Sequence, residues 1–157
     1  MLLTHHPKGN ILKLSIPITL GLILSFSSAQ MSAAEPKMHV SHAWVQEAPP
    51  SAEVLAGYMD LQNQSLQAQT LLGARSTDFK SVMLHQTVSK GGMAHMNHMP
   101  RIEIKPGSTL QLTPGGFHLM LINPKKRLKQ GDQVEVLLEF QGGLVVPVKF
   151  KISKERP

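Results

Sequence analysis

The feature that most constrains this fold is a succession of short extended segments separated by turn signals. The segment "VLAGYMDLQNQS" (54–65) alternates polar and apolar residues, and turn sequences such as "KPGS", "TPGG" and "KQGD" separate later segments. Alternation with a period of two is typical of strands with one buried face. We find no amphipathic stripe of helical length. The pattern therefore predicts an all-β fold, an Ig-like β-sandwich of about eight short strands.

The expected strands follow one another through most of the chain after residue 37. They are 38–45, 54–65, 70–77, 81–88, 101–104, 108–112, 116–123, 133–140 and 144–152. The larger core side chains are expected to be Trp44, Tyr58, Phe79, Phe117, Phe140 and Phe150. Residues 90–100, which begin with a Gly-Gly pair and end in proline, are expected to form a connecting loop.

The N-terminus has the order of a secretory signal peptide. Two lysines precede an apolar run at 14–26, and small residues follow it. A small-x-small pattern predicts cleavage before Glu35, with 27–29 as the second candidate. A transmembrane anchor is the alternative, but the run is shorter than the roughly 20 residues of a span and contains a proline. We predict a signal peptide at 1–34 and an exported, periplasmic domain at 35–157.

Charge and cysteine content narrow the function classes. Removing two lysines and no acid with the signal lowers the formal charge from +6 to +4. No basic repeat with interleaved aromatics is present, so nucleic acid is not an expected partner. The basic stretch "PKKRLK" (124–129) is read as a solvated turn, with a docking patch for an acidic partner as the alternative. The chain has no cysteine, which excludes disulfides, thiolate zinc sites and a blue-copper centre.

Histidine and methionine occur together at three places. Residues 93–99 contain three methionines and two histidines, "HLM" occupies 118–120, and "MLH" occupies 83–85. In a strand, residues two apart share a face, so His118 and Met120 share one and Met83 and His85 share another. Met83 itself is expected in the core because it lies in an apolar run. Thioether and imidazole together suit monovalent copper, and a thioether survives an oxidising compartment. The cluster favours a site that holds copper.

The spacing of these residues resembles the periplasmic copper chaperones of the PCu(A)C type. Their motif is His, ten residues, Met, twenty-one residues, then His-x-Met, and it matches His85, Met96, His118 and Met120. The similarity extends over about 41–152. It implies a cupredoxin-like β-sandwich, one Cu(I) bound by those two His and two Met, and copper delivery to the binuclear copper site of cytochrome c oxidase.

This chain departs from the family pattern around Met96. Additional potential ligands lie beside it at Met93, His95, His98 and Met99. We expect them to form a weaker auxiliary site able to take Cu(II), with Met93, His95 and Met99 on one side of the segment. Solvated side chains without a metal are the alternative.

The sequence therefore predicts a copper chaperone without enzymatic activity, whose partner is an apo copper acceptor such as a cytochrome c oxidase subunit or another assembly chaperone. Three alternatives stay open. A copper-sequestering or resistance protein would retain the metal. A type-2 copper enzyme would need more histidines and an open coordination position. A purely structural sandwich would not bind copper.

Overall fold

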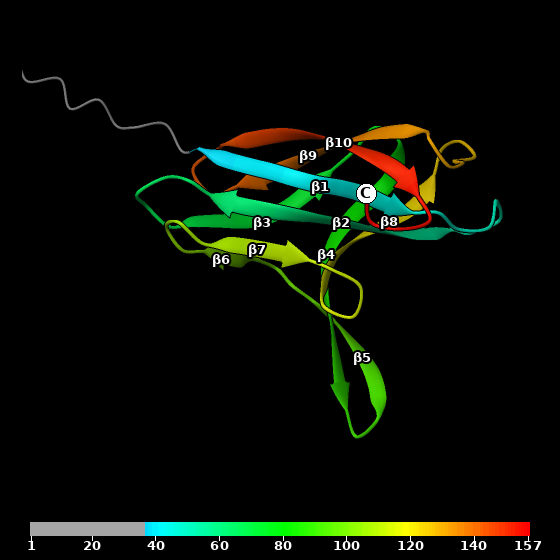
Figure 1. The fold of residues 1–157 in the computed structure, drawn as a ribbon, viewed down its shortest axis with the longest axis horizontal. Coiled ribbons are helices and arrows are strands. Elements are labelled where there is room, and N and C mark those ends of the chain that lie inside the picture. The colour runs from blue at the N-terminus through cyan, green and yellow to red at the C-terminus, as the bar shows by residue number, and fades with distance from the viewer. Residues whose placement is uncertain (1–36) are drawn as a thin grey trace, which may run out of the picture. The chain divides into compact units, whose positions relative to one another are not determined.

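The computed structural model describes residues 37–157, and this part of the chain is built from strands and turns without a helix (Figure 1). The strands are β1 (Met38–Gln46), β2 (Val54–Asn63), β3 (Gln69–Arg75), β4 (Phe79–Lys90), β5 (Met93–His98), β6 (Ile102–Ile104), β7 (Thr109–Leu112), β8 (Phe117–Pro124), β9 (Gln133–Phe140) and β10 (Val145–Ser153). The expected all-β fold is confirmed. The predicted signal peptide lies outside the described residues. Within them, no helix has the length and apolar character to span a membrane.

The strands form one sheet that closes on itself. Going round it, β3 pairs with β4, β4 with β8, β8 with β2, β2 with β1, β1 with β10, β10 with β9, and β9 with β3. The β1–β10 pair is parallel, and the others in this ring are antiparallel. Strands β5, β6 and β7 attach to β4, β3 and β2. Closure removes most open edges and encloses one apolar interior.

The interior is filled by alternate residues of the closed strands. In β8, Leu119 and Leu121 are fully buried, whereas Phe117 is only half-buried. Of the other aromatic residues expected in the core, Phe79, Phe140 and Phe150 pack in it. Trp44 and Tyr58 are buried outside the core cluster, with ring centroids 5.0 Å apart. Burying a side chain of this size contributes about 1.5–3 kcal/mol relative to leaving it exposed. This packing fixes which face of each strand points outward.

Residues 90–100 are a correction to the sequence prediction. Instead of a loop, they contain strand β5, which pairs with an extended β4 from Lys90↔Met93 to His85↔His98. The hairpin projects beyond the rest of the sheet (Figure 1). Gly91 and Gly92 form its two-residue turn with φ of 61° and 76°. Both angles are left-handed, as a primed hairpin turn requires, so glycine is suited to both positions.

Candidate metal centre

The register between β4 and β8 brings the first histidines and methionines together. His85 lies directly opposite His118, and Met83 lies directly opposite Met120. Because residues two apart share a face, all four project from the same side of the two strands. The intervening Leu84 and Leu119 point into the core and are 2% and 0% exposed. The four donors therefore lie on the outer face of the closed sheet.

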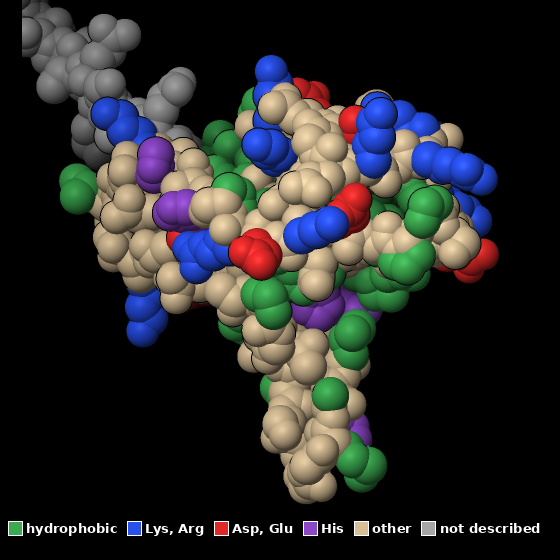
Figure 2. Space-filling model, turned by 45° about the vertical axis from the view of Figure 1, so that its right-hand side comes forward, with side chains coloured by type: hydrophobic (Ala, Val, Ile, Leu, Met, Phe, Trp, Pro, Cys, Tyr) green, Lys and Arg blue, Asp and Glu red, His purple; other side chains and the backbone are tan. Residues whose placement is uncertain are grey.

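Strand β5 extends this face by a third strand. His98 lies opposite His85, and Met96 lies opposite Thr87. The rings of His98, His85 and His118 therefore form a row across β5, β4 and β8. The centroid of His85 is 5.5 Å from that of His98 and 6.0 Å from that of His118, both edge-on. Figure 2 shows histidine side chains beside hydrophobic ones where the hairpin leaves the rest of the sheet.

His118 is held in one tautomer by the turn that precedes its strand. Its side chain is buried, and its Nδ1 lies 3.1 Å from the backbone oxygen of Gly116. A carbonyl can only accept, so Nδ1 carries the proton and donates it. The other nitrogen, Nε2, keeps a free lone pair. A hydrogen bond of this kind fixes the orientation of a metal-binding imidazole.

His85 is the central ring of the row and has an unsatisfied nitrogen. Its Nδ1 is buried and has no hydrogen-bond partner among the described residues. Burial lowers the pKa of His85 below its usual value, and the neighbouring His118 and His98 lower it further. The ring is therefore neutral at pH 7, the form that can coordinate a metal.

The methionines of this face differ in exposure. Met120 is half-buried, whereas Met96 is 57% exposed and Met83 is 39% exposed. The sequence-based expectation that Met83 belongs to the core is therefore wrong. The apolar run around Met83 predicts burial. Because Met83 is two residues before His85 on the same strand, however, it shares the outward face of β4 with that histidine. Sequence reasoning missed two features of this face. Met83 lies on it, and His98 lies beside His85.

The four residues predicted to form an auxiliary site do not share one face. Met93 and His95 lie on the side of the hairpin opposite to Met96 and His98, because strand residues alternate. Met99 packs against the core, and its N–H donates to the oxygen of Leu84. The auxiliary site stays a prediction, for which Met93 and His95 are the two donors left together. Within residues 37–157, no three His, Asp, Glu or Cys side chains form a metal-binding group by themselves.

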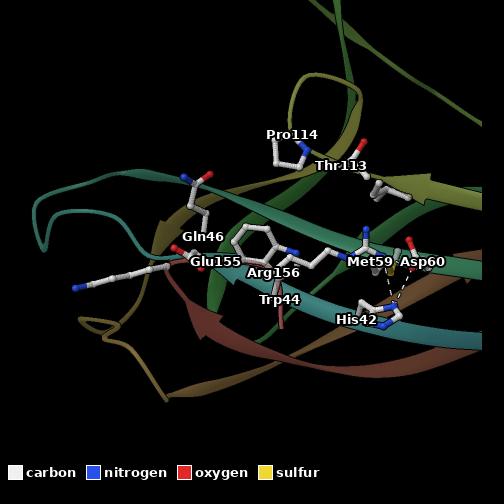
Figure 3. Close-up of a pocket in the computed structure, with 11 residues that line it drawn as sticks. His42, Trp44, Gln46, Met59, Asp60, Thr113, Pro114, Glu155 and Arg156 are labelled. Carbon is white, nitrogen blue, oxygen red and sulfur yellow. Dashed lines mark hydrogen bonds and ion pairs between the residues drawn. The ribbon is translucent and has the colours of Figure 1, made fainter.

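A separate pocket of about 380 Å³ lies against β1 and β2 (Figure 3). Asp60 occupies its polar side and binds both His42, at 2.9 Å, and Arg156. Figure 3 shows Arg156 extending across the pocket above Trp44 toward this carboxylate. Asp60 therefore ties the segment after β10 to β1 and β2. This pocket contains none of the predicted copper ligands.

Comparisons with known proteins agree with the arrangement of the strands. The LpqE-like family, described as lipoproteins, matches residues 38–152. The lipoprotein Lxx21020 of Leifsonia xyli subsp. xyli is 37% identical over 117 residues, which cover 74% of this chain and 69% of that protein. The solution structure of CuI-DR1885 from Deinococcus radiodurans is 34% identical with a TM-score of 0.61, covering 81% of this chain and 86% of that one. The copper-bound PCuAC domain from PmoF2 shares the fold at a TM-score of 0.63 and 24% identity, covering 76% of this chain and 94% of that domain.

Proposed function

Because this chain belongs to the LpqE-like family and its solved structural neighbours are PCuAC copper-binding domains, we propose that it is a periplasmic copper chaperone that carries Cu(I). The proposed ligands are His85, Met96, His118 and Met120. The proposal includes cleavage of a signal peptide at 1–34, so that the domain at 35–157 works in an oxidising compartment.

One observation carries the proposal: His85 and His118 face each other across β4 and β8, and each has a nitrogen available for a metal. Met120, two residues from His118 on the same face, adds a thioether. Imidazole and thioether form a neutral, soft donor set, which favours Cu(I) over Zn(II) or Mg(II). A set without cysteine is not lost to disulfide formation.

The hairpin gives the carrier a route for release. Met96 lies on β5, whose six residues are all exposed, whereas the two histidines and Met120 lie on strands of the closed sheet. The exposed thioether would dissociate first, and a donor from the acceptor would replace it. We propose the copper site of cytochrome c oxidase, or a chaperone that assembles it, as that acceptor.

The direct test is an anaerobic Cu(I) titration of the protein purified from a periplasmic extract, in competition with a Cu(I) chelator. We expect one tightly bound Cu(I), strong weakening in His85→Ala and His118→Ala, and no change in His39→Ala, an exposed histidine of β1. Equal binding by the His85 and His118 variants and the parent would contradict the proposed ligands.

Transfer distinguishes a chaperone from a sink. The copper-loaded protein is mixed with the apo copper-binding domain of a cytochrome c oxidase subunit, and the metal content of both is measured after separation. A chaperone passes its Cu(I) to the acceptor, whereas a sequestering protein retains it.

A further inference from the structure

Met83 is not part of the motif that identifies the candidate ligands, yet it lies among them. It occupies the outer face of β4, two residues before His85 and directly opposite Met120. Although apolar, its side chain is 39% exposed. The core on the other side of β4 is complete without it, because Leu84 and Leu119 fill that position.

Together with the histidine pair, Met83 completes a compact block of two imidazoles and two thioethers. His85–His118 and Met83–Met120 are successive pairs on neighbouring strands. Directly opposite residues have Cβ atoms about 4.5–5.5 Å apart, and residues two apart on one strand are separated by about 6.6 Å. All four side chains project from this small area, so they can reach one ion above its centre.

Met96 is placed much less favourably than Met83 to share one ion with Met120. It is opposite Thr87 on β5, whereas Met120 is opposite Met83 on β8. The two methionines are therefore separated by two strand spacings and four residues along β4. With strands about 4.8 Å apart and a rise of about 3.3 Å per residue, their backbone positions are roughly 16 Å apart. A thioether pair across that span needs movement of the hairpin.

We infer that Met83 is a Cu(I) ligand, completing a four-donor shell with His85, His118 and Met120. The inference rests on the proposed function and extends it, because Met96 then becomes the exchanging donor. When the hairpin is extended, as in this structure, Met83 holds the ion on rigid strands. When the hairpin bends over the face, Met96 binds the same ion, and it is the donor that leaves first when the acceptor supplies its own.

The first test is Cu(I) affinity of the exported protein and its leucine variants, since leucine preserves volume and removes the sulfur. We expect Met83→Leu to weaken Cu(I) binding by at least about tenfold. Met38→Leu is the matched control, a partly buried methionine of β1 that belongs to no proposed copper site, and should change affinity by less than about twofold. Parent-like affinity in Met83→Leu would overturn the inference.

The second test identifies the sulfur ligands directly. Methionine methyl groups are labelled with ¹³C, and their NMR signals are followed during addition of one equivalent of Cu(I). Shifts of Met83 and Met120 at one equivalent are expected. Shifts of Met96 and Met120 without Met83 would overturn the inference while leaving the proposed function intact. Failure to bind Cu(I) at all would overturn both.

Discussion

The turn of the β4–β5 hairpin allows a quantitative prediction. A double substitution, Gly91→Ala with Gly92→Ala, places side chains at two left-handed positions. A Cβ at either site would meet no atom within 4 Å, so the cost arises from backbone conformation alone and not from a clash. That cost is about 1–2 kcal/mol per residue, or roughly 2–4 kcal/mol for the pair.

This cost is large compared with the stability of the hairpin. Beyond Thr87, β4 pairs only with β5, and every residue of β5 is exposed. Isolated two-stranded hairpins are marginally stable, and about 1.4 kcal/mol corresponds to a tenfold change in an equilibrium constant. We therefore expect the tip of the hairpin, from Val88 to His95, to open in the variant. The closed sheet should keep its melting temperature, because the core is unaffected.

The assay is amide hydrogen exchange measured by NMR, with thermal unfolding recorded in parallel. The amides that pair between Val88 and His95 should lose protection by at least about tenfold, while those of β8 and β9 stay protected. Gly91→Asn is the matched control, because Asn-Gly is favoured in a primed turn. Unchanged protection at the tip, or an equal loss throughout the sheet, would refute this reasoning.

Three further predictions follow. Leu119→Ala truncates a fully buried side chain of β8 and should lower the free energy of unfolding by about 2–5 kcal/mol. Urea titrations measure this loss, and a loss under about 1 kcal/mol would contradict the packing described. Cu(I) and Ag(I) should outcompete Zn(II) in metal competition, and equal zinc affinity would argue against thioether ligands. Because the pKa of His85 is lower in the folded protein, the unfolded chain takes up the proton first as the pH falls below about 6.5. The metal-free protein should therefore lose stability between pH 7.5 and pH 5.5, less so in His85→Gln, and identical pH profiles of the melting temperature would contradict this.

Much of the fold could be predicted because most strands bury one face. Alternation marked the strands β8 and β9, and turn sequences marked their ends. Strand β5 lacks this signal, since both of its faces are exposed, and the Gly-Gly pair before it favours a loop when only the sequence is considered.

The candidate site was predictable where it depended on spacing and not where it depended on register. The spacing motif predicts His85, His118 and Met120 as candidate ligands. The similarity to PCuAC domains is confirmed. The pairing of Met83 with Met120 arises from long-range strand alignment, which no local pattern of residues contains.

The separation of the two faces of β4 and β8 has a consequence for variation among related domains. The leucines that hold the sheet together and the candidate donor side chains alternate along the same strands without sharing a surface. A donor on the outer face can be exchanged for another without disturbing the interior, so ligand chemistry and thermal stability can change independently. One scaffold can in this way be retuned to a different metal or a different affinity by single substitutions.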